Sequence, residues 1–156
     1  MNRSISIPEW HQMALQGNAP PVRIQLSGYS MNPLIRGYQD YVTVAPAEGE
    51  IRTGDIVMFC EPGTGRYVMH RVWDQRDGQY LIWGDNCPKP DGWMPADAIW
   101  GRITLIERGQ REIRPDPAKG VRWARFWHQA GKVYRFCRRV KEGILRRINR
   151  LRGTGK

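Results

Sequence analysis

The chain has 156 residues, 40% of them hydrophobic, with seven Trp and 17 Gly, which suits one folded domain with an appendage. Its formal net charge of +10 is unevenly spread, because residues 1–118 hold 12 Lys and Arg against 14 Asp and Glu, whereas residues 119–156 hold 13 Lys and Arg against one acid. The basic character therefore belongs to the C-terminal segment and carries no information about the main domain.

The cysteines and the apolar runs of the sequence indicate the cellular compartment in which we expect the protein. Cys60, Cys87 and Cys137 show no CxxC spacing, which argues against a disulfide framework or a zinc knuckle and favours a reducing compartment. Neither a secretory signal peptide nor an apolar window of roughly 18 residues, the length of a membrane span, is visible. No His, Cys and Asp cluster has metal-ligand spacing. We therefore expect a cytoplasmic protein without a cofactor or a metal ion.

Residues 1–21 predict a short N-terminal helix followed by a linker. Ser6 and Glu9 have the spacing of a capping box, and Gly17 can end the helix. The residues expected to face the core are Trp10, Met13 and Leu15. Two prolines at 20–21 then predict the linker.

From residue 22 to 106, short apolar runs alternate with turn residues, a pattern typical of a mainly β domain. The predicted strands are 22–27, 41–45, 55–60, 66–74, 79–84 and 99–106. Asp77 and Gly78 predict a hairpin turn, and the Pro-rich segments 88–95 and 115–117 predict loops. We expect this β domain to cover residues 22–118.

Residues 119–156 predict a basic amphipathic helical tail, since apolar residues recur at spacings of three and four between Arg and Lys. Basic residues beside Trp123 and Trp127 fit a helix that lies on an anionic membrane surface, here the inner face of the membrane. A solvated helix packed on the domain is the plainer interpretation. Nucleic acid ranks lowest as a partner, because no base-reading motif accompanies the charge.

A serine at a predicted strand end is the candidate nucleophile. Ser30 lies in Gly28-Tyr29-Ser30-Met31-Asn32-Pro33, directly after the first predicted strand. A serine two residues after a glycine and shortly before a proline can be held on a tight turn with its hydroxyl exposed, as a nucleophile requires. Taken alone, such a serine is more often a turn former. Further motifs follow in order: Gly54-Asp55-Ile56-Val57, His70-Arg71, Gly84-Asp85-Asn86 and Asp91.

In this order the motifs resemble the signal peptidase I and LexA-like serine peptidases, over about residues 22–106. The matched positions of the nucleophile segment are Gly28, Ser30, Met31 and Pro33. The resemblance implies the β fold of that family and Ser30 as the nucleophile. Bacterial members place a lysine where this chain has His70, and the first lysine here is Lys89. The resemblance is therefore to the Ser–His type, as in the endoplasmic-reticulum and archaeal signal peptidases.

His70 suits the role of general base, because imidazole, with a reference pKa of about 6.5, is neutral at pH 7 without special burial. The resemblance makes Asp91 or Asp85 the carboxylate that fixes the histidine tautomer. Asp85 in its turn can bond its own backbone, so we favour Asp91. The Ser30 backbone N–H would bind the oxyanion; the second donor stays open, with Ser27 as an unmatched substitute.

Three remaining residues are interpreted without a catalytic role. Asp40 lies near the shifted position of a family aspartate, and we interpret it as a turn residue. Neither Cys60 nor Cys87 has a matched base in the sequence, which argues against a cysteine nucleophile.

The sequence thus predicts a serine endopeptidase that cleaves a signal-like, leader or precursor peptide. The alternative is a catalytically silent binding module that uses its basic tail on a membrane surface or nucleic acid. A LexA-like self-cleaving regulator is disfavoured, because the chain has neither an N-terminal helix-turn-helix nor the lysine base. The oligomeric state stays open.

Overall fold

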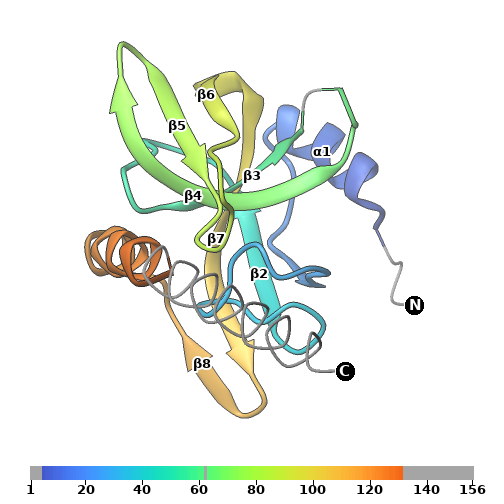
Figure 1. Cartoon of the computed structure of the whole chain (residues 1–156). Coiled ribbons are helices and arrows are strands. Elements are labelled where there is room, and N and C mark those ends of the chain that lie inside the picture. Colours follow the sequence, from blue (N-terminus) through green and yellow to red (C-terminus); the bar gives the residue numbers. More distant parts are fainter. Residues whose placement is uncertain (1–4, 62, 132–156) are drawn as a thin grey trace, which may run out of the picture.

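The structure is a computed structural model and describes residues 5–61 and 63–131. One eight-stranded sheet dominates it, with the order β1-β2-β7-β3-β4-β5-β6 and with β8 added beside β7 (Figure 1). All strand pairs are antiparallel. The strands are β1 (Val22–Gln25), β2 (Tyr41–Pro46), β3 (Ile56–Cys60), β4 (Tyr67–Arg76), β5 (Gln79–Trp83), β6 (Gly92–Pro95), β7 (Ile99–Arg108) and β8 (Arg111–Ile113), and a short 3-10 helix, η1 (Ala96–Ala98), precedes β7.

The N-terminal helix α1 (Ile7–Leu15) begins with the expected capping box. The Ser6 side chain accepts a hydrogen bond from the Glu9 N–H, and the Glu9 carboxylate accepts one from the Ser6 N–H at 2.9 Å. Trp10 is buried, and its Nε1 donates to the carbonyl of Pro20 at 2.7 Å. The expectation for Leu15 is wrong, because its side chain is 63% exposed. At 3.6 residues per turn, it lies about 140° around the helix from Trp10.

All six predicted strands are present, with ends within two residues of the prediction. Asp77 and Gly78 have φ of 50° and 73°, which is the backbone of the predicted two-residue hairpin turn. The prediction of a loop over 88–95 is wrong in part, because β6 forms there and pairs with β5. Its Pro95 is tolerated because β6 is the edge strand of the sheet. The three-residue strand β8 was also missed.

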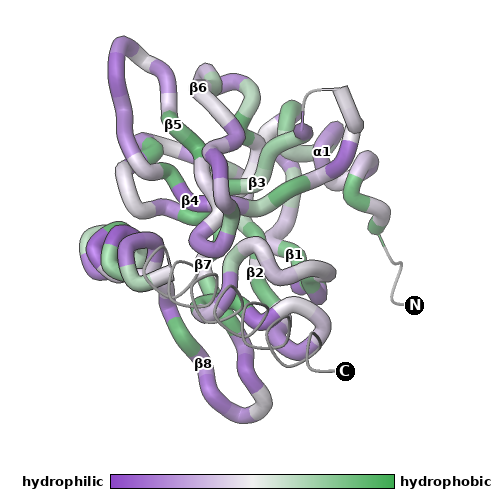
Figure 2. Tube along the Cα trace, in the orientation of Figure 1, coloured by the Kyte–Doolittle hydropathy of each residue, from purple (hydrophilic) through white to green (hydrophobic). Residues whose placement is uncertain are grey.

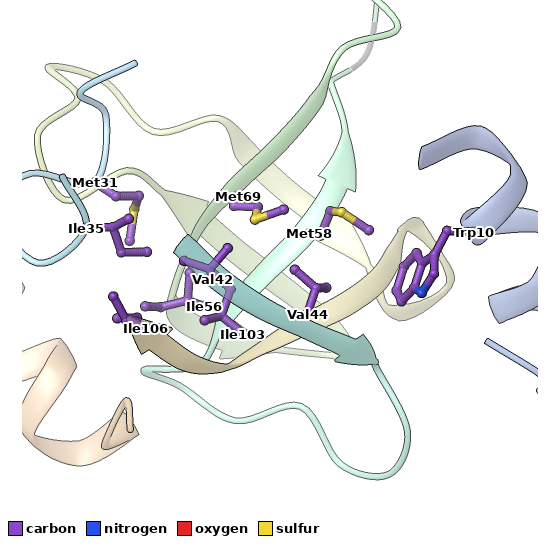
Figure 3. Packing of buried hydrophobic residues seen from close by; sticks show 10 residues of the cluster. All are labelled: Trp10, Met31, Ile35, Val42, Val44, Ile56, Met58, Met69, Ile103 and Ile106. Atoms are coloured by element: carbon purple, nitrogen blue, oxygen red, sulfur yellow. The ribbon is translucent and has the colours of Figure 1, made fainter. Parts of the chain in front are cut away.

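The core lies on both faces of the sheet at its centre. Successive side chains of a strand point to opposite faces, and β3 is buried on both. Ile56 and Met58 pack in one cluster, while Val57 and Phe59 pack in the other. The first cluster, shown in Figure 3, contains Trp10, Met31, Ile35, Val42, Val44, Ile56, Met58, Met69, Ile103 and Ile106. Figure 2 shows a hydrophilic tip on the β4–β5 hairpin.

Residues 117–131 form a helix, as the sequence predicts for the first part of the tail. Its buried side chains are Val121, Ala124 and His128, and the His128 ring packs edge-on against Trp73 and Trp83. Residues 132–156, which hold the rest of the predicted tail, lie outside the described residues. Within the described residues, no helix is long and apolar enough to cross a bilayer.

Candidate active site

The site is assembled from three segments: the loop between β1 and β2, strand β4, and the loop between β5 and β6. Two hydrogen bonds join the two loops. The N–H of Asn86 donates to the carbonyl of Ser30 at 2.7 Å, and the Asn86 side chain donates to the carbonyl of Tyr29 at 3.1 Å. The sequence separates these residues by more than fifty positions, so only the fold brings the Gly-Asp-Asn turn against Ser30.

Apolar burial fixes the loop that carries Ser30. Met31 is 3% exposed and Ile35 is 1% exposed, and both enter the core cluster from this loop (Figure 3). Gly28 has a φ of 92°, a backbone conformation that favours glycine. A Cβ at Gly37 would collide with the backbone of Gly28, so the loop closes tightly on itself. Met31 therefore anchors the loop beside Ser30.

Ser30 is half-buried at the start of a turn. Among the described residues, neither its hydroxyl nor its N–H has a hydrogen-bond partner. The hydrogen bond between Ser30 and His70 that a resting dyad would have is thus not formed in this structure. Pro33, the last residue of the motif, follows Asn32 through a cis peptide bond.

His70 lies in the middle of β4, opposite Val57 of β3, and is 5% exposed. Its Nδ1 is 2.7 Å from Oδ2 of Asp91, whose side chain is 15% exposed. An ionised carboxylate can only accept a hydrogen bond, so Nδ1 is the nitrogen that carries the proton. This leaves Nε2 as the atom of the ring that can take up or release a proton.

The environment of His70 changes its basicity. Burial lowers the pKa of His70, but the hydrogen bond and the negative charge of Asp91, together with the contact to Cys87, outweigh burial and raise the pKa to about 9. The ring is therefore a stronger base than free imidazole. It is protonated over much of the neutral range and becomes an acceptor as the pH approaches 9.

Asp85 has a different partner from Asp91. Its two carboxylate oxygens accept hydrogen bonds from Nε and Nη2 of Arg71 at 2.8 and 2.7 Å, and both side chains are fully buried. Nη1 of Arg71 donates to the carbonyl of Gly54 at 2.8 Å. A Cβ at Gly120, in the helix over 117–131, would collide with the same guanidinium. The pair thus ties β4, the loop after β5 and the C-terminal helix together.

Cys87 is a neighbour of His70 that the sequence analysis did not place there. Its Sγ lies 3.9 Å from Nε2 of His70, so the statement that Cys87 lacks a base is wrong. A Cβ at Gly84 would lie 2.6 Å from that sulfur and 2.9 Å from Nε2, so only glycine leaves room for the contact. The position of Cys87 directly after the Gly-Asp-Asn turn was the signal available in the sequence.

Asp40 closes the turn that begins at Arg36, whose N–H donates to its carboxylate at 2.8 Å. It is also fully buried and pairs with Arg108 of β7 at 2.7 Å, which the interpretation as a turn residue did not include. Burial raises the pKa of Asp40, but the hydrogen bonds from Arg108 and Arg36 outweigh burial, and the pKa lies below its ordinary value. Asp40 therefore anchors the loop of Ser30 to the sheet.

Comparison with known proteins assigns no family to the chain. No model of a protein family matches it, and none of the curated proteins compared with it matches. In the described residues, no group of three or more His, Cys, Asp and Glu side chains could hold a metal ion. The chemistry of the site must therefore be argued from its own residues.

Proposed function

We propose that the protein is a serine endopeptidase in which Ser30 is the nucleophile, His70 is the general base and Asp91 orients His70. The observation that carries the proposal is the partly buried hydrogen bond of 2.7 Å between His70 and Asp91. The ring nitrogen that remains, Nε2, lies against Gly84, two residues before the Asn86 that binds the carbonyl of Ser30. A His–Asp pair and a serine hydroxyl that has no hydrogen-bond partner among the described residues, on two loops joined through Asn86, supply the groups that nucleophilic catalysis uses.

The reaction proceeds through an acyl-enzyme. When a peptide binds, the Ser30 hydroxyl comes within hydrogen-bond reach of Nε2 of His70, a contact that in many enzymes tightens only with substrate in place. Ser30 attacks the carbonyl carbon while Nε2 takes its proton, and Asp91 stabilises the imidazolium. His70 then protonates the leaving amine. A water molecule, deprotonated by His70, releases the acyl group and restores the hydroxyl.

The oxyanion of this intermediate has one donor in the loop itself. The N–H of Ser30 has no partner among the described residues and can bind the developing negative charge. Gly28 offers no hydroxyl, and Ser27 is exposed one residue before it. The substrate class is an extended peptide of the signal-like, leader or precursor kind, as the resemblance to signal peptidases implies.

A catalytically silent binding module is the second candidate, and the Ser30 hydroxyl without a hydrogen bond to His70 favours it. The peptidase and the binding module are distinguished by a cleavage assay. The purified full-length protein is incubated with a library of proteome-derived peptides, and new peptide termini are sequenced by mass spectrometry. Cleavage that the Ser30→Ala and His70→Asn variants lose supports the peptidase. Cleavage by wild type and Ser30→Ala alike, or no cleavage by the folded wild type, overturns it.

The outer face of the C-terminal helix suggests where the protein works. Trp123 and Phe126 are 45% and 61% exposed, with their ring centroids 5.8 Å apart, and the neighbouring Arg122 and Arg125 are also exposed. Residues 119–131 contain no acid. Exposed aromatic side chains beside arginines fit the boundary of an anionic bilayer. We propose that this face binds anionic lipid.

Sedimentation with vesicles tests the lipid proposal. Wild type is expected to bind vesicles of phosphatidylcholine with phosphatidylglycerol more than vesicles of phosphatidylcholine alone, and less in high salt. Joint substitution of Trp123→Ser and Phe126→Ser should weaken binding. Leu15→Ser removes an equally exposed apolar side chain on α1 and serves as the matched control. Equal binding to both vesicles, or equal loss in the control, contradicts the proposal.

A further inference from the structure

The thiol of Cys87 is the third member of a contiguous row of reactive groups. Its Sγ lies 3.9 Å from Nε2 of His70, and Nδ1 of the same ring is bonded to Asp91. Cys87 is half-buried, so part of the residue is open to solvent. Cys60, at the end of β3, is also half-buried but makes no hydrogen bond with a histidine in the described part of the chain. Cys87 and Cys60 thus fall in the same range of exposure but differ in their neighbours, because Cys87 contacts a histidine.

The backbone holds this thiol in place. The Cys87 N–H donates to the carbonyl of Gly84 at 3.0 Å, which closes a tight turn. The Cys87 carbonyl accepts from Nε1 of Trp83 at 3.0 Å. Both backbone groups of the residue are thus fixed, and the missing side chain at Gly84 opens the space in which sulfur and imidazole meet. The fold therefore places the backbone of Cys87 next to the ring of His70.

We infer that Cys87 is a modification site for low-molecular-weight disulfides, and that its modification switches the His70 site off. In its neutral form His70 takes the proton of the thiol on Nε2, and the thiolate attacks one sulfur of the disulfide. A bond forms between Cys87 and that sulfur while the original S–S bond breaks. The departing thiolate takes the proton from Nε2. The disulfide is itself the oxidant, because its departing sulfur is reduced as the sulfur of Cys87 is oxidised. A free thiol reverses the exchange.

The mixed disulfide on Cys87 would lie against Nε2 of His70, the nitrogen that acts as base in the proposed peptidase mechanism. A thiol-linked group on Cys87 fills the space beside Nε2, where the hydroxyl of Ser30 and the leaving amine must come. The loss of activity rests on the proposed peptidase function. The selective reactivity of Cys87 does not rest on it, because it needs only the contact with His70.

The reactivity is tested with oxidised glutathione on the full-length protein, followed by quenching with N-ethylmaleimide and peptide mass spectrometry. Cys87 is expected to gain the glutathione mass about tenfold faster than Cys60, since thiolates react and a basic neighbour supplies them. His70→Asn should bring the Cys87 rate down to that of Cys60 and leave the Cys60 rate unchanged. Equal rates of the two cysteines in the wild type overturn the inference, whatever the folding of the variant.

The proposed loss of activity on modification of Cys87 is tested in a peptide-cleavage assay. Oxidised glutathione should stop cleavage by the wild type, dithiothreitol should restore it, and the Cys87→Ser variant should cleave in both conditions. Cleavage by the wild type that continues with Cys87 fully modified contradicts the switch. If Cys87→Ser is inactive while Ser30→Ala cleaves, the thiol is the nucleophile and both proposals fail. If Cys87 reacts selectively but no form cleaves, the proposed function fails and the modification site stands.

Discussion

The carboxylate of Asp85 faces the guanidinium of Arg71 through two hydrogen bonds of 2.7 and 2.8 Å, and it does not reach the neighbouring His70. His70 and Arg71 are consecutive on β4, so their side chains leave the strand on opposite faces. The loop after β5 then supplies one aspartate to each face, Asp91 to His70 and Asp85 to Arg71. We therefore expect Asp85 to control mainly the stability of the protein and Asp91 mainly its activity.

Asp85→Asn is expected to destabilise the protein by about 3–5 kcal/mol, because Arg71 would be left as an uncompensated buried charge. The free energy of unfolding in urea measures the effect. Asp97→Asn, at an exposed carboxylate, is the control and should change stability by less than about 0.5 kcal/mol. An Asp85→Asn variant as stable as this control would contradict a structural role of the pair.

Asp91→Asn is expected to lower kcat by about 10²–10⁴-fold, because the amide no longer fixes the tautomer of His70 or stabilises its imidazolium. The pKa of His70 should also fall, since Asp91 helps to raise it. The rising limb of the pH–rate profile then moves to lower pH. Peptide cleavage at several pH values measures both effects, and an unchanged profile would argue against the His70–Asp91 pair as the base.

Activity and stability should respond to pH in opposite directions through His70. Only the neutral ring accepts a proton from Ser30, so kcat/KM should rise with pH until about 9, the pKa of His70. A histidine with a raised pKa adds stability that is fully present below about 6.5, its ordinary value, and is lost as pH rises through about 9. Parallel rate and urea-unfolding measurements test this, and cleavage that is maximal near pH 6 would contradict it.

Gly84→Ala is expected to reduce activity sharply. The added methyl group would lie 2.9 Å from Nε2 of His70 and 2.6 Å from Sγ of Cys87, so the ring and the turn must move apart. Misplacement of a catalytic group by about 1 Å costs about 10²-fold in rate. Cleavage assays with circular dichroism as a folding check measure the effect. A folded variant with wild-type activity would show that His70 needs no close contact with this turn.

Local signals in the sequence determined most of the elements of this protein. The capping box of Ser6 and Glu9, the turn at Asp77 and Gly78, and the alternation of apolar residues act within a few residues, so they can be interpreted without the fold. They predicted six strands and the start of the C-terminal helix. The short edge strands β6 and β8 escaped, because their pairing with β5 and β7 defines them more than their own composition does.

The tertiary structure alone decided which side chains meet. The partner of His70 is 21 residues away and that of Arg71 is 14 residues away, and both come from one loop. The sequence named Asp85 and Asp91 as candidates but held no physical measure of which face of β4 each would reach. The contact of Cys87 with His70 was hidden for the same reason. Distances across a sheet depend on strand order and loop path, which local spacing does not encode.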